Sequence, residues 1–371
     1  MTPFKRVVIT GDVLRPAADG HGGWSSATWR NIRWLWSMIA PSLEQCGYPV
    51  AMMAWDERLL SPKGVAFDTP LFYRRCGVEL SLAGWGELAV SRDWPQDARR
   101  MLTDPLQDAL VIGYELPEST THVLAEAGIP FIDFALHPVR FLDDLVFALR
   151  TNLPALHDVL VQHRLPDDVI HQQAAWIKAK SAWMRQPMPL PPGTVLILGQ
   201  VEHDRAMLRE DGGFHSLQDH AGRIHQLCCD YPLVLFKPHP YDAAGSASQQ
   251  AIRRFGSIQW VKPSFYQLLC QPELERVVAL NSSGLTEAAY FGVEAEALLP
   301  PLYAFGDTPP VGDGSSGALV AQNQDWLGVH FWRRLFGLAS DHPPSVSHPP
   351  NRIRRSMNAD WGYSAIEKVV A

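Results

Sequence analysis

The residues best suited to chemistry follow apolar runs that predict β-strands. "VLFKPHPYD" ends its run on Lys237 and His239, and the proline after each holds the loop extended. "NSSGLTEAA" then places two hydroxyls and free backbone N–H groups at the start of a predicted helix, where the helix dipole attracts an anion. These residues predict a phosphate site made by two neighbouring strand ends: Lys237, His239, Asn281, Ser282, Ser283 and Gly284. The simpler alternative is that Ser282 or Ser283 only caps the helix.

Polar residues also follow other predicted strands. "GQVEHD" supplies Gln200 and Asp204, and "GYELPES" supplies Glu115. Ligands of open α/β sheets bind beyond the carboxyl ends of the strands, so these side chains are further candidates for the site. Glu287 comes four residues after Ser283, about one helical turn along, where its carboxylate can accept hydrogen bonds from a ribose diol. It can equally be an exposed helix glutamate.

The sequence gives little support for a metal or a P-loop. His215, His220 and His225 recur every fifth residue, a spacing that rotates side chains off one helical face. The glycine-rich stretch 312–319 lacks the preceding strand and the lysine of a P-loop. We therefore expect neither a metal nor a cofactor.

The elements that must position these residues alternate as strands and helices, which predicts an α/β protein with two doubly wound domains. Four prolines in 186–193 predict a linker, and "DHPPSVSHPP" (341–350) predicts a second break. We expect an N-terminal acceptor domain over 1–186, a C-terminal nucleotide-sugar domain over 193–340, and a terminal helix within 351–371 that packs back on the first domain.

Composition limits the classes of partner. The chain has 371 residues and a formal net charge of −7, which argues against nucleic-acid binding. Its five cysteines show no C-x-x-C spacing, so we expect a reducing, cytoplasmic location. No signal peptide or membrane-spanning run is evident. "WRNIRWLWSMIAP" (29–41) mixes arginine and tryptophan at helical spacing, which fits either a peripheral contact with a membrane surface or a helix that faces the core.

Five segments together resemble the retaining β-Kdo glycosyltransferases of bacterial capsule and O-antigen (lipopolysaccharide) synthesis. They are "VIGYE", "IDFALHPVRFLDDL", "LGQVEHD", "FKPHP" and "NSSGLTEAAYFG". The resemblance covers most of residues 105–300. It implies a GT-B fold, with two Rossmann-like domains, an active site in the cleft between them, and a C-terminal helix that crosses back.

The resemblance also implies roles. The donor would be CMP-β-Kdo, and the acceptor a hydroxyl of a surface glycan or glycolipid at the inner face of the inner membrane. Asp204 would be the nucleophile and Glu115 the acid/base. The phosphate and ribose contacts would come from the residues predicted above, with Gln200 and Glu287 among them. The carboxylate of Kdo needs a cation, for which the candidates are Arg140, Lys178 and Arg205.

Three alternatives stay open. In an inverting CMP-sialic acid transferase, Asp211 of "REDGG" would be the general base. A nucleotide-sugar epimerase would prefer a UDP donor. A non-catalytic partner in polysaccharide assembly could keep a relic nucleotide pocket. Many relatives carry a second transferase module on the same chain, for which this sequence has no room, so the resemblance does not identify the acceptor.

Overall fold

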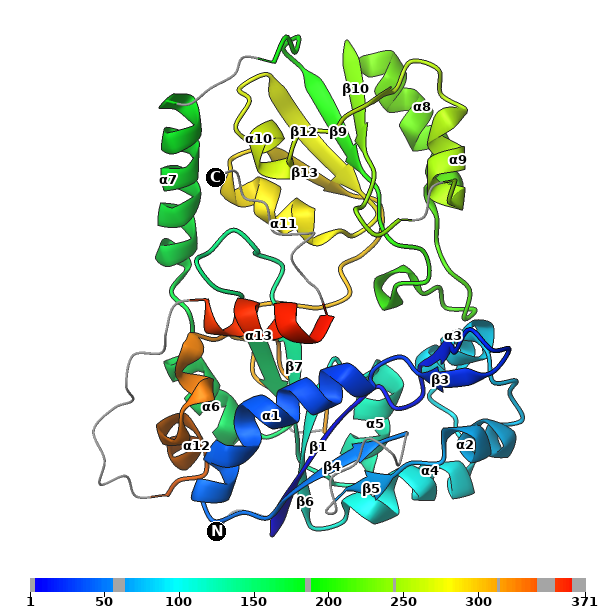
Figure 1. Ribbon diagram of the computed structural model, residues 1–371, viewed down its shortest axis with the longest axis vertical. Helices are drawn as coiled ribbons and strands as arrows, with labels where there is room; N and C mark the ends of the chain where they lie inside the picture. Colours follow the sequence, from blue (N-terminus) through cyan, green and yellow to red (C-terminus); the bar gives the residue numbers. More distant parts are fainter. Residues whose placement is uncertain are drawn as a thin grey trace.

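Two α/β domains lie one above the other in the computed structural model (Figure 1). The structure describes residues 4–55, 64–183, 188–242, 245–311, 314–338 and 351–361. The predicted break at 341–350 and the chain beyond Trp361 lie outside these ranges, as do the first two residues of the predicted 186–193 linker.

The first domain is built on a seven-stranded sheet with the order β14-β8-β7-β6-β1-β4-β5. Five neighbouring strands of this sheet, β7, β6, β1, β4 and β5, run parallel. Strands β8 and β14 extend the sheet in antiparallel fashion. The bounds are β1 (Arg6–Gly11), β4 (Val50–Ala54), β5 (Val65–Ala66), β6 (Ala109–Tyr114), β7 (Phe131–Leu136), β8 (Phe147–Thr151) and β14 (Val320–Ala321). A small hairpin of β2 (Pro16–Ala18) and β3 (Trp24–Ser26) stands apart.

The second domain holds a five-stranded parallel sheet with the order β11-β10-β9-β12-β13. Its strands are β9 (Thr194–Leu198), β10 (Leu233–Lys237), β11 (Gln259–Trp260), β12 (Leu274–Ala279) and β13 (Glu294–Ala297). Alternate residues of β9 enter different cores: Val195 and Ile197 lie in one, Leu196 and Leu198 in the other. Burial on both faces explains why this strand is apolar throughout.

Helices cover both sheets. In the first domain they are α1 (Trp29–Gln45), α2 (Thr69–Cys76), α3 (Leu82–Val90), α4 (Gln96–Thr103), α5 (Glu118–Glu126), α6 (Pro154–Gln162) and α12 (Val329–Leu335). In the second they are α8 (Ala221–Asp230), α9 (Ala247–Arg253), α10 (Phe265–Leu269) and α11 (Ser283–Tyr290). Two more are α7 (Asp167–Trp183), which packs in the core of the second domain, and α13 (Arg352–Trp361), which packs in the core of the first.

The five parallel strands have the same order in both domains, and each sheet has a point where the direction of winding reverses. This point lies between β1 and β6 in the first sheet and between β9 and β12 in the second. Crevices at such points are where doubly wound sheets bind ligands. Asp12 and Glu115 follow the strands at the first point, and Gln200 and Asn281 follow those at the second. The predicted fold, two Rossmann-like domains of the GT-B type, is confirmed.

The predicted domain borders need correction. Strand β14 and helix α12 fall inside the predicted 193–340 domain. However, β14 pairs with β8, and Trp332 of α12 packs in the core of the first domain. Conversely α7, which falls inside the predicted 1–186 domain, packs Ile170, Ala174 and Ile177 into the core beneath α11. The segment with β14 and α12 thus buries its apolar side chains in the first domain, and α7 buries its apolar side chains in the second.

Helix α13 crosses back onto the first domain, where it lies beside α1 (Figure 1). Ile353 and Met357 enter the first core, and Trp34 donates a hydrogen bond to Ser356 at 3.0 Å. The buried carboxylate of Asp144 accepts from the backbone N–H groups of Ile353 and Arg354 at 2.9 and 2.8 Å, and so caps the start of the helix.

Helix α1 is the amphipathic segment for which a membrane contact was one prediction. Its apolar side chains Ile32, Leu35, Ile39 and Leu43, three or four residues apart, are buried in the first domain. Trp34 is 1% exposed. The core-facing interpretation is therefore correct for this helix. Among the described residues, no helix combines the length and apolarity needed to cross a membrane.

Candidate active site

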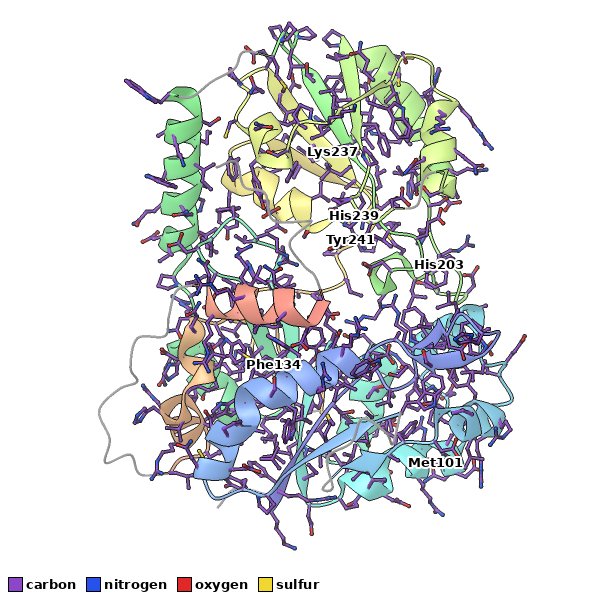
Figure 2. All side chains as sticks on the ribbon, viewed as in Figure 1. Met101, Phe134, His203, Lys237, His239 and Tyr241 are labelled. Atoms are coloured by element: carbon purple, nitrogen blue, oxygen red, sulfur yellow. The ribbon has the colours of Figure 1, made fainter. Side chains whose placement is uncertain are left out.

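The loop after β10 brings His239 against the end of β9. The Gly199 N–H donates to the Lys237 carbonyl at 2.9 Å, and a Cβ on Gly199 would lie 3.2 Å from the His239 backbone nitrogen. His239 Nδ1 accepts from the Tyr241 N–H at 3.2 Å. Burial lowers the pKa of this histidine, although Asp204 and Asp242 oppose the shift. Figure 2 shows His239 and Tyr241 on the side of the second domain that faces the first.

Gln200 and Asn281 join the two strands at the switch point of the second sheet. Gln200 donates to the Asn281 side-chain oxygen at 3.1 Å and accepts from the Asn281 N–H at 2.9 Å. Asn281 Nδ2 in turn donates to the Ala206 carbonyl. Both amides are therefore engaged in holding the 3-10 turn Arg205–Met207, and the predicted contact with the donor would be additional to this positioning role.

Helix α11 begins beside this pair. Ser282 is its N-cap and accepts from the Gly284 N–H at 3.3 Å, so the capping interpretation describes this serine. Capping of this kind contributes about 1 kcal/mol, and the Leu285 N–H donates to the Ser282 carbonyl at 3.0 Å, so two N–H groups of the first turn are engaged. Ser283 is exposed at the same end. Gly284 is buried, and a Cβ at this position would lie 2.6 Å from the Leu198 side chain.

Asp204 lies on the second domain and Glu115 on the first, and their charges interact. Asp204 is exposed, and its carboxylate accepts from the Ala206 N–H at 3.0 Å as the cap of the short turn. Glu115 follows β6 with a φ of 50°, a left-handed conformation that is uncommon for a residue with a side chain. Burial raises the pKa of Glu115, and the charge of Asp204 raises it further, while Arg205 opposes the shift. The two carboxylates are thus close enough to influence each other.

Arg205 extends from the second domain into the first. Its Nη1 donates to the Glu115 carbonyl at 2.5 Å, and the side chain is buried. The charge of Arg205 acts on three carboxyl groups of the first domain: Asp12, Glu115 and Asp133. Burial raises the pKa of each of these acids, and Arg205 partly offsets that effect. Of the three cations predicted for the sugar carboxylate, Arg205 bonds the Glu115 backbone, and the charge of Arg140 also acts on Glu115.

Arg140 and Glu287 meet at the domain interface. Glu287 Oε1 accepts from the Arg140 N–H and from the Tyr266 hydroxyl, each at 2.7 Å, and the side chain is 4% exposed. Burial raises the pKa of Glu287 to about 7. This glutamate is not the exposed helix residue of the simpler alternative. The predicted ribose contact of Glu287 would require its second oxygen, since the first joins the domains.

We expect Glu287→Gln to raise the melting temperature by a few degrees at pH 8 and to change it little at pH 5. The raised pKa means that the folded chain keeps a proton that the unfolded chain releases. Native stability is therefore full below the ordinary pKa of 4.5 and falls as pH rises through 7. Glutamine stays neutral and keeps the accepting oxygen. Thermal unfolding at both pH values measures the effect, with the exposed Glu44→Gln as control. An equal shift at both pH values would contradict it.

Two predicted cations have other partners. Lys178 Nζ donates to the Phe291 carbonyl at 2.8 Å, at the carboxyl end of α11. This end is about 12 Å along the helix from Ser283, because a helix rises 1.5 Å per residue. The contact of Lys178 with the sugar carboxylate stays a prediction. Lys237 Nζ donates to the Pro263 carbonyl at 2.7 Å, and burial lowers its pKa. Lys237 lies deeper in the second domain than His239 (Figure 2), and its phosphate contact stays a prediction.

The structure adds residues that the sequence analysis did not select. Asp12 is buried at the end of β1 and accepts from Trp85 Nε1 at 2.8 Å. Asp133, in the middle of β7, accepts from the Leu116 N–H at 2.8 Å and from Arg150 Nε at 3.0 Å. A signal existed for both aspartates, because each is an acid at or inside an apolar run. In the described part of the chain, no three His, Cys, Asp or Glu side chains are grouped to hold a metal.

Asp211, the general base of the alternative transferase, is exposed in a turn of the second domain. Its carboxylate pairs with Arg209 at 2.8 Å and accepts from the Gly213 N–H at 3.0 Å. These contacts lower the pKa of Asp211, the Gly213 bond most of all. A lowered pKa makes a carboxylate a weaker base, which disfavours this alternative.

Comparisons with known proteins were made on sequence and on structure. No protein-family model matches the chain, and no curated protein matches it either. Among solved structures, the β-Kdo 2,7-transferase KpsC of Thermosulfurimonas dismutans is 13% identical, with a TM-score of 0.32, over 57% of this chain and 74% of its own. The β-Kdo 2,4-transferase KpsC of the same organism is 15% identical, with a TM-score of 0.34, over 50% and 67%.

A third similar structure is the UDP-GlcNAc 2-epimerase of Neisseria meningitidis bound to UDP-GlcNAc. It is 11% identical, with a TM-score of 0.30, over 79% of this chain and 82% of its own. Scores this low carry no weight for activity. We therefore argue the function from the residues of this chain.

Proposed function

We propose that this protein is a retaining glycosyltransferase that moves Kdo from CMP-β-Kdo to a hydroxyl of a bacterial surface glycan or glycolipid. The observation that carries the proposal is the pairing of Asp204, exposed on the second domain, with Glu115, whose pKa is raised on the first. Two carboxyl groups with different environments, held across a domain interface, are what a double displacement at a sugar carbon requires.

The donor half of the site would bind the cytidylate. The first turn of α11, where Ser283 is exposed, follows β12 at the switch point, and the loop that carries His239 follows β10, the neighbour of β9. Together they supply hydrogen bonds to the leaving phosphate, and the helix dipole adds positive potential. Arg205 and Arg140, whose charges both act on Glu115, are the cations placed to neutralise the Kdo carboxylate. The proposed step uses no metal and no cofactor.

The proposed reaction has two steps. In the first, a carboxylate oxygen of Asp204 attacks the anomeric carbon of Kdo, and the bond from that carbon to the phosphate oxygen breaks, its electron pair leaving with CMP. In the second, Glu115 takes the proton of the acceptor hydroxyl, the hydroxyl oxygen bonds to the anomeric carbon, and Asp204 departs with its electron pair. Two inversions at one carbon give net retention.

Intact-protein mass spectrometry tests the proposal. After incubation with CMP-Kdo generated in situ and no acceptor, we expect a fraction of the protein to carry one Kdo. In parallel, CMP should raise the melting temperature more than UMP, which separates this reaction from that of an epimerase. An unmodified protein, no CMP release with any glycan, and equal effects of the two nucleotides would together reject the proposal and favour the non-catalytic alternative.

We propose a cytoplasmic location for the reaction. The five cysteines show no disulfide pattern, which fits a reducing compartment. A glycolipid acceptor would bring the enzyme to the inner face of the inner membrane.

A further inference from the structure

A cavity in the first domain is lined by α5, by Arg150 of β8 and by the chain that leads into β14. It has a volume of about 780 Å³, and its lining in that chain comes from residues within 302–311 and 314–319. Such a volume is within the range of roughly 300–1,000 Å³ typical of small-molecule sites. The donor contacts proposed above include none of its lining residues, which leaves the cavity without an assigned ligand.

Two side chains in the cavity wall carry polar atoms that the fold does not satisfy. Arg150 is 7% exposed, and it donates from Nε to Asp133 at 3.0 Å and from Nη1 to Glu118 at 2.7 Å. Its Nη2 is buried and has no hydrogen-bond partner among the described residues, and the same holds for the Tyr303 hydroxyl. Buried polar groups are rarely left unpaired, so these two atoms suggest hydroxyl partners supplied by a ligand.

Tyr303 connects the cavity wall to the residues around the proposed catalytic pair. The Tyr303 ring centroid lies 5.4 Å from the Arg150 guanidinium carbon and 5.1 Å from that of Arg205. Arg205 in turn bonds the Glu115 carbonyl, and Asp133 bonds the Leu116 N–H. One aromatic ring and two guanidinium groups therefore separate the cavity from Glu115. A ligand in the cavity would lie one layer of side chains away from the proposed base.

The charges of the wall identify the class of ligand. Arg92 and Arg150 are positive, and Glu118 and Glu126 are negative, so the wall carries no net charge. A nucleotide or a multiply charged phosphate would find no excess of cations here. A neutral, hydroxyl-rich ring fits better, because arginine and glutamate side chains bond pairs of hydroxyls and the Tyr303 face can pack against ring C–H groups.

We propose that this cavity binds the carbohydrate acceptor, with one sugar ring against Tyr303 and its hydroxyls bonded by Arg150 and Glu118. The inference rests on the proposed glycosyltransfer and specifies its acceptor as a short, uncharged glycan end. It also assigns Tyr303 as a residue that determines acceptor specificity, a role for which the sequence offered no signal.

Saturation-transfer NMR on the full chain tests the inference. The probes are the methyl glycosides of glucose, galactose, N-acetylglucosamine and rhamnose, each measured in the presence of CMP. We expect the wild-type protein to give saturable signals with at least one probe. Ala125→Trp, which fills the cavity from α5, should reduce those signals at least fivefold and leave the thermal shift by CMP unchanged. Ala179→Trp, on the exposed face of α7, is the matched control and should keep both.

A second variant guards against a general disturbance of α5. Tyr303→Phe keeps the ring and removes only the unpaired hydroxyl, and we expect a threefold to tenfold weaker signal with an unchanged melting temperature. No saturable signal from any probe, or equal signals from Ala125→Trp and the wild type, would overturn the inference. If the glycosides bind but CMP gives no thermal shift, the donor proposal fails and the cavity assignment stands.

Discussion

Asp204→Asn is expected to lower the rate of Kdo transfer by about 10³-fold or more and to abolish the covalent adduct. The amide has the size of the carboxylate and can still accept from the Ala206 N–H, so the short turn should stay in place. It cannot form a covalent bond to the anomeric carbon, and losses of this size are typical when a nucleophile is removed. Intact mass spectrometry and the rate of CMP release measure the two effects.

Asp211→Asn is the matched control for this variant. It removes an exposed carboxylate of the same domain and should leave the transfer rate and the adduct unchanged. If Asp211→Asn is inactive while Asp204→Asn keeps full activity, the nucleophile proposal is wrong and the inverting alternative is correct. NMR analysis of the product anomer then gives an independent answer, since the two mechanisms produce opposite configurations.

Glu115→Gln should lower the transfer rate by about 10²- to 10⁴-fold, the usual contribution of a general base, and should increase the adduct. The reason is that Glu115 acts in the second step, so its loss leaves the covalent intermediate waiting for an unactivated hydroxyl. Asp204→Asn and Glu115→Gln therefore have opposite effects on the same mass peak. The exposed Glu44→Gln serves as the control and should match the wild type in both measurements.

The pH dependence of transfer provides a second readout for Glu115. Burial raises its pKa above the ordinary value of 4.5, and a general base must be ionised to act. The rate should therefore rise with pH, with an inflection above 4.5, and this limb should vanish in Glu115→Gln. A variant that keeps the limb would assign the titration to another group and would contradict the role of Glu115.

Strands β1, β6, β9 and β10 were predictable because each is largely apolar and polar residues follow it. β6 and β9 show the pattern most clearly. β8 was missed because Arg150 interrupts its apolar run. Asp133 and Glu118 pair with this arginine and make it acceptable in the core. The two-residue β14 is too short for any periodicity to reveal.

The candidate site was predictable where a residue follows a strand and not where tertiary contacts decide. Asp204, Glu115 and His239 follow the ends of their strands, and the charge of Asp204 acts on both of the other two. The hydrogen bond of Lys178 to the Phe291 carbonyl depends on how α7 packs against α11, which the sequence does not reveal. The hydrogen bond from the Arg140 N–H to Glu287 joins residues 147 positions apart, so no local sequence pattern predicts it.

The way the chain passes between the domains also has a consequence for its synthesis on the ribosome. The second sheet is a single continuous stretch, from β9 to β13, and is complete once residue 297 has emerged. The first sheet and its core, by contrast, need β14, α12 and α13, which are translated last. Domains generally fold as units as they emerge, so the second domain can fold while the first still lacks an edge strand and two helices. The half of the molecule that is translated first is thus the half that is finished last.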